Sequence, residues 1–477
     1  MNENIKLDQI IERLPDEWHE DLIPEIIEII KKESFCLAVI DDDPAGTQAV
    51  ADVTVMNTWD YDSILELLNL PEKALFFNTN NRTLNQFEAR EIIKNTIILI
   101  EQVSDLLTSN IDILYRFDST LRGHFKLILE THLQETKSEL NGVIFVPYFS
   151  EGRRYTINNI QYVTEYDSNK DEEILIPVSD SEFSKDKNFS YTNSNLINWV
   201  SEQLGDIDYI KKIKSISIDD IRKGGPDKIQ SILNSLSKDQ LCIVNAISMK
   251  DIEVVAYSLM KVKKNDKKFL YITASSFIRV LLGQKNKPFL NRKSLNLKSN
   301  KGALIVVGSY VEKTNQQLKK LLESSYVFPI QINIENIILK NQKLNLQEIY
   351  KIANLIDQNL KLKKNVVIYT NRKFVKLVNC DSREIGVKIL QCLVNIIDNM
   401  QIEPNYIICK GSTTADYISK YNFKTSKAKV LGQVVPGVSV WELGLDSSIP
   451  YMKFVVFAGN VGDNNSLVEV VENLSII

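Results

Sequence analysis

The chain has 477 residues, of which 57 are basic and 61 acidic, for a formal net charge of −4. This balance gives no whole-chain electrostatic reason to expect nucleic acid or an anionic membrane as a partner. The length predicts two to three domains at roughly 150 residues each. No run of about 18 apolar residues indicates a membrane span.

Cysteine and histidine usage bears on compartment and metal binding. The five cysteines are scattered and form no C-x-x-C pair, and there are only three histidines. This usage favours reduced thiols and argues against a zinc site. Glu3, Lys6 and Asp8 make the N-terminus unlike a signal peptide. We therefore predict a cytoplasmic protein without a metal ion held by side chains.

In chain order, an amphipathic segment comes first. Residues 1–34 carry apolar residues at helical spacing, interrupted near Pro15 and Pro24, which predicts short helices. From Phe35 onward, apolar runs of strand length alternate with helical patterns, which predicts a mainly parallel sheet. The expected strands are 35–40, 53–56, 74–78, 111–117, 143–146, 213–218, 241–245 and 269–272, and the expected helices are 63–70 and 84–107.

Two polar stretches interrupt the alternation. Residues 164–193 are rich in Asp, Ser, Lys and Asn with weak apolar periodicity, which predicts a long loop or lid. Residues 283–302 are rich in Lys and Asn and are the best linker candidate. A second series follows, with expected strands at 303–307, 327–332, 366–369, 406–409 and 454–457 and expected helices at 313–323 and 382–400.

The sequence thus predicts an α/β protein of two α/β domains, whose mainly parallel sheets face each other across a cleft. A helical segment at 1–34 precedes a first domain at 35–282. A linker at 283–302 then leads to a second domain at 303–477.

The strand ends of the first half offer carboxylate, hydroxyl and guanidinium groups. They include Asp41, Asp42, Asp43, Arg82, Asp118, Ser119, Thr120, Arg122, Arg153 and Arg154. The carboxyl ends of parallel strands meet at one edge of a sheet, where ligands bind. Arginine binds carboxylates in a bidentate way, and carboxylates accept hydrogen bonds from sugar hydroxyls. This set predicts a small, anionic, polyhydroxylated ligand, with a structural ion-pair network as the alternative.

The strand ends of the second half are small and rich in glycine and hydroxyls. They are Gly308-Ser309, Gly411-Ser412-Thr413-Thr414, Pro436-Gly437 and Gly459-Asn460-Val461-Gly462. Glycine lets the backbone approach a phosphate, and helix N-termini supply free N–H groups. Each turn alone also fits an ordinary helix cap, but together they predict a nucleotide. The chain has neither a G-x-x-x-x-G-K-[ST] nor a G-x-G-x-x-G motif.

At these turns the chain resembles the four-carbon acid sugar kinase family, also called the DUF1537 or hydroxyacid kinase family. The most specific likeness is Asp118-Ser119-Thr120-Leu121-Arg122-Gly123, which matches the family signature D-S-T-L-R-G. Asp42-Asp43-Pro44-Ala45-Gly46 is similar to the opening D-D-x-T-G, with Ala45 in place of Thr. Further likenesses are Gly152-Arg153 and the four glycine turns of the second half.

The resemblance implies an ATP-dependent kinase of carbohydrate metabolism that phosphorylates a hydroxyl of a small sugar acid such as threonate or erythronate. The first domain would bind the acid through Asp42, Asp43, Arg82, Asp118, Ser119, Thr120, Arg122 and Arg153. Asp43, Asp118 and Arg122 would act in catalysis. The second domain would bind ATP with Mg²⁺ through Ser309, Gly411, Ser412, Thr413, Thr414, Gly437, Gly459 and Asn460.

Two positions depart from the family pattern. Ser412 stands where a glycine is usual, and Phe457 stands where many members carry a lysine. Their effect on nucleotide binding is left open. So are the choice of acid, the hydroxyl that is phosphorylated, the carboxylate that acts as the base, and the oligomeric state, with a homodimer as one option.

Two other functions remain as alternatives. Asp41-x-Asp43 resembles the start of the D-x-D-x-T motif of aspartyl phosphatases, although Ala45 stands where that motif has Thr or Val. A non-catalytic protein that binds a sugar acid or a nucleotide would also fit. Such a protein would be stabilised by its ligand without consuming ATP.

Overall fold

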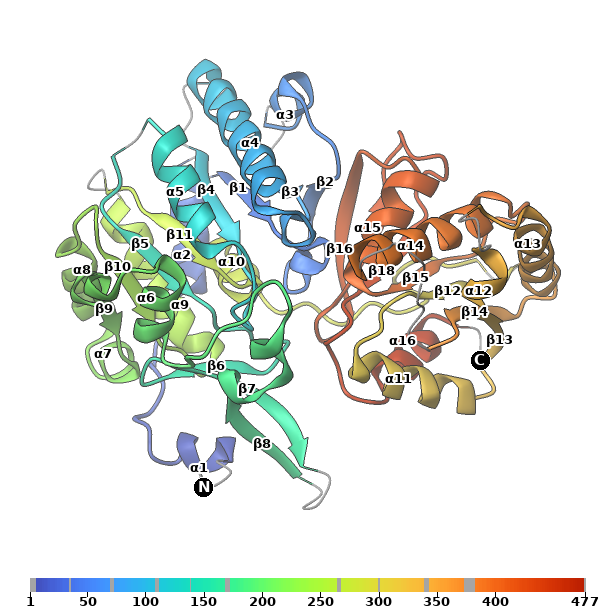
Figure 1. Cartoon of the computed structure of the whole chain (residues 1–477). Coiled ribbons are helices and arrows are strands. Elements are labelled where there is room, and N and C mark those ends of the chain that lie inside the picture. Colours follow the sequence, from blue (N-terminus) through green and yellow to red (C-terminus); the bar gives the residue numbers. More distant parts are fainter. Residues whose placement is uncertain are drawn as a thin grey trace. The chain divides into compact units, whose positions relative to one another are not determined.

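The computed structural model describes residues 6–33, 36–68, 73–107, 111–137, 139–167, 172–263, 267–298, 301–338, 343–372 and 382–475. The chain divides into two compact units. Unit 1 consists of Met1–Val53 and Trp59–Asn286, and unit 2 consists of Thr54–Thr58 and Lys287–Ile477. Figure 1 shows their elements.

The core of unit 1 is a parallel sheet. Its strand order is β3-β1-β4-β11-β5-β10-β9. The strands are β1 Cys36–Asp41, β3 Ala74–Asn78, β4 Ile111–Arg116, β5 Val143–Val146, β9 Ile213–Ile216, β10 Leu241–Val244 and β11 Leu270–Thr273. Most of their residues are buried on both faces, which explains the continuous apolar runs in the sequence.

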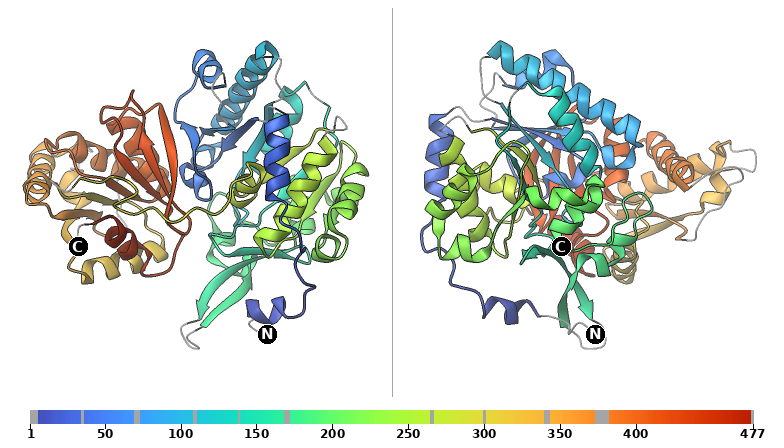
Figure 2. Two further views of the ribbon diagram at one scale, coloured as in Figure 1. Left: turned by 180° about the vertical axis from the view of Figure 1, so that it is seen from behind. Right: turned by 60° about the vertical axis from the view of Figure 1, so that its left-hand side comes forward.

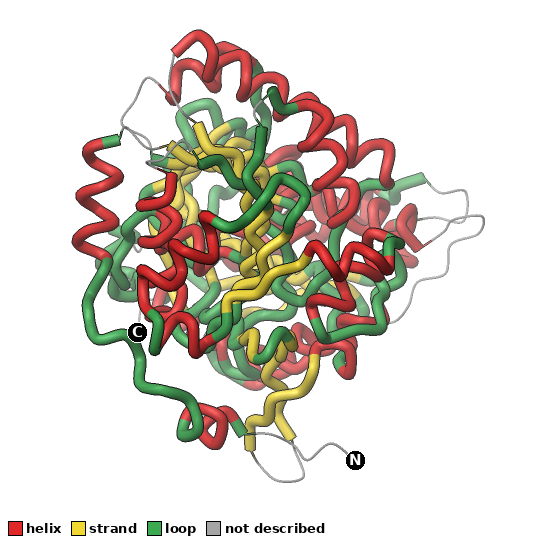
Figure 3. The backbone as a smooth tube through the Cα atoms, turned by 90° about the vertical axis from the view of Figure 1, so that its left-hand side faces the viewer, coloured by secondary structure: helices red, strands yellow, loops and turns green. Residues whose placement is uncertain are grey.

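Helices cover both faces of this sheet, as Figures 2 and 3 show. One group packs together on one face and comprises α3 Tyr61–Leu68, α4 Gln86–Leu107, α5 Phe125–Glu135 and α6 Leu196–Leu204. The other comprises α2 Ile23–Lys32, α7 Ile218–Arg222, α8 Gly225–Asn234, α9 Met249–Lys263 and α10 Ser275–Leu281. The short helix α1 Leu7–Ile11 begins the described chain.

The prediction of a loop over residues 164–193 is wrong for its first half. A small antiparallel sheet is present instead, formed by β6 Arg154–Ile157, β7 Ile160–Asp167 and β8 Glu172–Pro177. Apolar and polar residues do alternate along these strands, but charged residues at their ends weaken the pattern. Residues 181–191 contain one short 3-10 helix, at Glu182–Lys185, and are otherwise irregular.

Unit 2 has a parallel sheet with an antiparallel extension. The parallel strands, in the order β13-β14-β12-β15-β18, are β13 Val327–Ile332, β14 Asn365–Thr370, β12 Leu304–Val307, β15 Ile407–Lys410 and β18 Lys453–Phe457. The antiparallel strands β17 Val438–Leu443 and β16 Lys427–Val435 follow, and β2 Val53–Met56 lies next to β16. The helices are α11 Glu312–Glu323, α12 Ile334–Ile337, α13 Leu346–Lys361, α14 Ser382–Asp398, α15 Ser412–Tyr417 and α16 Ser466–Leu474.

In both units, long connections leave a central strand in opposite directions. In unit 1 the chain passes from β1 to β3 on one side and then to β4 on the other side of β1. In unit 2 it passes from β12 to β13 and β14 on one side and then to β15 on the other. Such switch points leave a crevice at the carboxyl ends of the strands. Within the described part of the chain, no helix is long and apolar enough to span a membrane.

Candidate functional site

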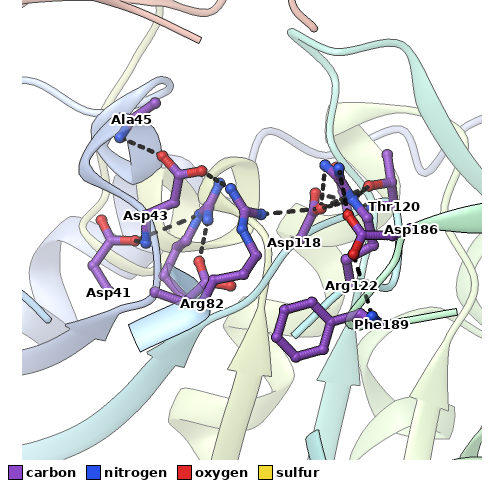
Figure 4. A network of polar contacts seen from close by, with 12 residues as sticks. Asp41, Asp43, Ala45, Arg82, Asp118, Thr120, Arg122, Asp186 and Phe189 are labelled. Carbon is purple, nitrogen blue, oxygen red and sulfur yellow. Dashed lines mark hydrogen bonds and ion pairs between the residues drawn. The ribbon is translucent and has the colours of Figure 1, made fainter. Parts of the chain in front are cut away.

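The switch point of unit 1 brings the predicted acidic turn and the D-S-T-L-R-G turn together. Asp41 is the last residue of β1 and lies in register with Asn78 of β3 and Arg116 of β4. Arg82 follows β3 and forms ion pairs with Asp43 and with Asp118, at 3.0 Å from the latter. One arginine therefore links all three strand ends, and Figure 4 shows the resulting network.

The three consecutive carboxylates have different environments. Asp41 is 2% exposed, and its Oδ1 accepts a hydrogen bond from the backbone N–H of Asp43. Burial, together with the nearby Asp42, raises the pKa of Asp41 well above its ordinary value despite the opposing charge of Arg116. Asp42 pairs with Arg116 through Oδ1, whereas its buried Oδ2 has no hydrogen-bond partner.

Asp118 is the centre of the second half of the network. It accepts hydrogen bonds from the Thr120 hydroxyl at 2.6 Å and from Arg122 Nε at 2.9 Å. Arg122 Nη2 lies 2.8 Å from the same oxygen. Burial alone would raise the pKa of Asp118, but Arg122, Arg82 and the Thr120 hydrogen bond together lower it far below its ordinary value. Asp118 is thus an ionised carboxylate that holds two arginines in place.

Arg154 differs from the other arginines of the cluster. It is 5% exposed, and among the described residues no carboxylate forms an ion pair with it. Its Nε has no hydrogen-bond partner. Burial lowers its pKa to about 10, although Asp118 opposes the shift. The close approach of its guanidinium to Gly152 explains the glycine there, because a Cβ would overlap Arg154 Nη1.

Residues 181–191, which we call the covering segment, pack over these guanidinium groups. The Phe183 ring lies 5.0 Å from Arg122 Cζ and 5.7 Å from Arg154 Cζ, distances typical of cation–π contacts. Asp186 lies 3.6 Å from Arg122 Nη1. The Tyr191 hydroxyl donates to the Thr120 carbonyl at 2.8 Å. The second half of the predicted loop or lid therefore lies directly on the cluster.

Most of the residues predicted to bind the acid meet here, but Arg153 does not. The Arg153 guanidinium pairs with Glu173 on β8, and its neighbour Arg154 lies within the cluster. Ser119 is buried, and its carbonyl accepts a hydrogen bond from Gln161. Sequence reasoning missed Arg116, Phe183 and Asp186. The available signal for Arg116 was a charged residue near the end of an otherwise apolar strand.

The switch point of unit 2 brings three of the predicted glycine turns together. Backbone N–H groups of Gly308 and Ser309 donate to the Lys410 carbonyl at 3.2 and 3.1 Å. A Cβ on Gly411 would lie 3.1 Å from Ser309 Cβ, and a Cβ on Gly459 would lie 2.5 Å from Ser309 Oγ. The Thr314 hydroxyl joins these turns, since it donates to the Gly459 carbonyl at 3.0 Å.

The remaining predicted nucleotide residues are placed as follows. Ser412, Thr413 and Thr414 form the first turn of α15, and Asn460 follows Gly459 in its turn. Gly437 lies in the hairpin turn between β16 and β17, with its N–H bonded to Gln433 Oε1. Among the described residues, no hydrogen bond joins Gly437 to the other turns.

The two departures from the family pattern have local explanations. Gly411, not Ser412, has the positive φ of 120°, so the turn requires glycine only at the first of these positions. Phe457 lies in register with Lys410 on the neighbouring strand, and Lys410 Nζ lies 3.6 Å from the centre of its ring. Burial lowers the pKa of Lys410 well below its ordinary value, and Lys313 adds to this.

Among the described residues, both switch points contain buried polar atoms without a hydrogen-bond partner and glycines packed closely against other groups. Within the same residues, neither contains a cluster of metal-binding side chains. Within the described ranges, the buried side-chain atoms without a hydrogen-bond partner include Asp42 Oδ2, Arg116 Nε and Arg154 Nε in unit 1, and Gln317 Oε1, Thr370 Oγ1 and Arg372 Nη1 in unit 2. Across the described ranges, no group of three or more His, Cys, Asp or Glu side chains is arranged to hold a metal ion.

Comparisons with known proteins agree with this division. A family model described as a sugar-binding N-terminal domain matches residues 37–281, and one described as a nucleotide-binding C-terminal domain matches residues 304–467. Together these matches define a two-domain protein with a sugar-binding domain followed by a nucleotide-binding domain. The chain belongs to the four-carbon acid sugar kinase family, DUF1537, as its signatures predicted.

Solved structures support the fold. A Haemophilus influenzae protein of the DUF1537 family is similar, with a TM-score of 0.60, 15% identity and coverage of 92% of this chain and 100% of its own. A protein from Salmonella typhimurium LT2 gives a TM-score of 0.62 at 12% identity, with 93% and 100% covered. The predicted two-domain α/β fold with mostly parallel sheets is confirmed. No curated protein sequence matches the chain.

Proposed function

We propose that this protein is a cytoplasmic, ATP-dependent kinase that phosphorylates a hydroxyl of a small sugar acid, such as the four-carbon acids threonate and erythronate. The observation that carries the proposal is Arg154, a buried guanidinium that has no carboxylate partner among the described residues and lies beside a cluster of paired aspartates and arginines. A buried cation is costly unless an anion compensates it. The carboxylate of a sugar acid has the charge and the planar geometry that arginine pairs with.

The other cluster residues would position the acid. Asp118 fixes Arg82 and Arg122 through ion pairs, and Asp43 fixes Arg82 from the other side. Guanidinium groups held in this way donate to the hydroxyls of a bound acid, and the carboxylates accept from them, without reorganising. Phe183 covers Arg122 and Arg154, so we propose that the covering segment shifts to admit the acid and then excludes water.

Asp42 is the carboxylate best suited to take the proton of the acceptor hydroxyl. Asp118 accepts hydrogen bonds from two arginines and Thr120, and Asp43 is held by Arg82 and the Ala45 N–H. Asp42 Oδ2 is the oxygen left without a partner. We therefore assign the base to Asp42, and Asp43 and Asp118 to positioning.

Replacing the proposed base tests that assignment. Asp42→Asn should lower kcat at least about 100-fold, in line with the usual contribution of general bases, with a smaller change in the KM of the acid. Steady-state kinetics of Asp42→Asn and Asp43→Asn provide the comparison. A larger loss of kcat in Asp43→Asn would return the role to Asp43.

The turns of unit 2 fit a nucleotide. Bound ATP would supply the phosphoryl group, with Mg²⁺ held largely by its phosphates. Gly411 and Gly459 keep the space beside Ser309 free of Cβ atoms, and Gly308 does the same beside Thr414. The backbone N–H groups of Ser412 and Thr413 at the start of α15 would donate to a phosphate. We propose Ser309, Thr414 and Asn460 as further contacts.

The phosphatase alternative depends on Asp41 as a nucleophile. Asp41 lies against Gly46, where an added Cβ would overlap the Asp41 carboxylate oxygens. Burial raises the pKa of Asp41. An enclosed carboxyl group whose ionised form is disfavoured by burial is a poor nucleophile. The geometry therefore favours a kinase over an aspartyl phosphatase.

The decisive experiment measures ADP release from Mg-ATP with a panel of three- to six-carbon sugar acids. A kinase should release ADP only with particular acids, whereas a non-catalytic binding protein would gain thermal stability from ligands without consuming ATP. ADP release that is unchanged by every acid would overturn the proposal.

Arg154 and Arg153 provide a matched pair for the acid site. Arg154→Met should raise the KM of the acid roughly ten- to a hundredfold, because a charge-assisted contact is lost. Arg153→Met removes a half-exposed ion pair with Glu173 and should change the KM little. The reverse order of effects would place the carboxylate of the acid on Arg153, as the sequence alone suggested.

A further inference from the structure

Arg372 is a cation at the switch point of unit 2 that the glycine turns did not predict. It follows β14 by two residues, and β14 lies next to β12, with Tyr369 in register with Val307. The Gly308–Ser309 turn begins directly after Val307. Arg372 therefore lies at the carboxyl ends of the strands, beside the first of the clustered glycine turns.

Three contacts hold the Arg372 guanidinium against this turn. Nη2 donates to the Ser309 carbonyl, and Nε donates to Asn315 Oδ1 at 2.9 Å. Cζ lies 4.6 Å from the centre of the Tyr310 ring. A guanidinium bonded on two nitrogens and stacked on a ring has a fixed orientation, so its third nitrogen is also fixed in direction.

That third nitrogen has no hydrogen-bond partner among the residues that the structure describes. Nη1 is buried and unbonded, and no carboxylate in the described part of the chain pairs with Arg372. Burial lowers the pKa of Arg372, with only Tyr310 opposing. The arginine as a whole is half-buried, so a ligand can reach the group. An uncompensated cation in this setting calls for an anion from outside the chain.

The surroundings suit a phosphate. Lys410, close to Lys313, is a second basic side chain at this switch point without a carboxylate partner among the described residues. It is buried, and its Nζ donates to the Ala458 carbonyl at 2.6 Å. Thr370 Oγ1, two residues before Arg372, is buried and has no partner. At the switch point of unit 1, Arg82, Arg116 and Arg122 pair with aspartates, so the two switch points differ in electrostatic character.

We propose that Arg372 is a phosphate-binding residue of the nucleotide site, with Nη1 directed at an oxygen of the β- or γ-phosphate. The inference rests on the proposed function, because it names the part of the nucleotide that this group contacts. Arginine matches phosphate geometry and keeps its charge when partly buried.

Calorimetry with ADP and adenosine tests the assignment, since adenosine has the base and ribose but no phosphate. Arg372→Met should weaken ADP binding at least tenfold and leave adenosine binding unchanged. Arg372→Lys should recover part of the ADP affinity, because lysine keeps the charge and loses the fork geometry. The matched control is Arg292→Met, which removes another half-buried arginine of unit 2, close to Tyr406 just before β15, at the opposite ends of the strands.

The possible outcomes distinguish a failure of the Arg372 proposal from a failure of the proposed function. Equal weakening of ADP and adenosine in Arg372→Met would show a structural or base-contacting role and overturn the proposal. Unchanged ADP binding would also overturn it while leaving the kinase proposal intact. Failure of the unmodified protein to bind ADP would instead overturn the proposed function, and with it this inference. Retained binding of the sugar acid by Arg372→Met shows that the chain is folded.

Discussion

At the scale of single residues, the two switch points differ in the charges that they present to a ligand. In unit 1, Asp41, Asp42, Asp43 and Asp118 meet three arginines, and only Arg154 lacks a counter-charge among the described residues. In unit 2, Arg372 and Lys410 have no carboxylate partner within the described ranges. Paired charges provide hydrogen bonds for neutral hydroxyls, while unpaired cations attract anionic groups. A sugar acid and a polyphosphate suit these two environments.

His132 makes the stability of the fold depend on pH. It is 4% exposed, and burial lowers its pKa from 6.5 to about 4. The unfolded chain therefore binds more protons than the folded chain between these values. His132 contributes stability above about pH 6.5, and this contribution is lost as the pH falls toward 4. The difference amounts to about 3 kcal/mol at most.

Urea unfolding between pH 4 and pH 7 measures this effect. In His132→Gln the slope of unfolding free energy against pH should be clearly smaller than in the unmodified protein. It should not vanish, because burial also lowers the pKa of His124. His19→Gln is the control, since that side chain is 76% exposed. An unchanged slope in His132→Gln would show that another group causes the acid sensitivity.

The sequence predicted that most residues of the unit 1 cluster lie at one sheet edge, but it did not predict the full electrostatics of the cluster. Asp42, Asp43, Arg82, Asp118 and Arg122 follow apolar strands, so their position at one edge could be predicted from the parallel order. Which carboxylate lacks a partner depends on side-chain directions in three dimensions, and no spacing reveals it. The choice between Arg153 and Arg154 depends in the same way on the alternating direction of residues along β6.

At the scale of elements, short turns after parallel strands build both sites. The boundaries of the parallel strands were predicted to within a few residues because these buried strands are continuous apolar runs, whereas the antiparallel strands β6, β16 and β17 were not predicted. The strands β7 and β8 were missed because a small sheet exposes one face and carries many charges. The covering segment was predicted as part of a long loop or lid, but its contacts were not predicted, because they depend on Phe183 and Asp186 meeting arginines distant in sequence.

The turn at Gly411 tests how strictly unit 2 needs its glycines. Gly411→Ala places a Cβ at a φ of 120°, 3.0 Å from Thr414 Oγ1. A residue with a side chain is strained there, at a cost of about 1–3 kcal/mol. Nucleotide affinity should fall with it, because the turn must shift to relieve the contact.

Gly386→Ala is the matched control, since a Cβ at Gly386 in α14 meets nothing within 4 Å. Alanine in a helix should stabilise by about 0.5–1 kcal/mol. Urea unfolding and ADP calorimetry distinguish the two variants. If Gly411→Ala binds ADP with unchanged affinity, the turn does not take part in nucleotide binding.

At the scale of the whole molecule, the order of the sequence and the division into units differ at one place. Residues 54–58 come from the first part of the chain, but they belong to unit 2, where β2 lies next to β16. Asn57 fixes this segment through its Nδ2, which donates to Ser419 Oγ and to the Thr425 carbonyl, both at 3.2 Å. Sequence patterns identify a strand at 53–56 but carry no signal for its partner strand.

Asn57→Ala tests whether residues 54–58 belong to unit 2. The variant leaves the Thr425 carbonyl and the Ser419 hydroxyl without a buried donor, which should destabilise by about 1–3 kcal/mol. Hydrogen exchange should then accelerate in unit 2, including β16 and β17, although the mutated residue lies near the N-terminus. Asn245→Ala is the counterpart in unit 1, where Asn245 Nδ2 donates to the Ile216 carbonyl at 2.9 Å, and there the faster exchange should appear in β9 and β10. Faster exchange in unit 1 for Asn57→Ala would contradict the assignment of residues 54–58 to unit 2. With the expected result, a fragment that begins at residue 287 lacks an integral strand, so the ADP affinity of unit 2 has to be measured in the full chain.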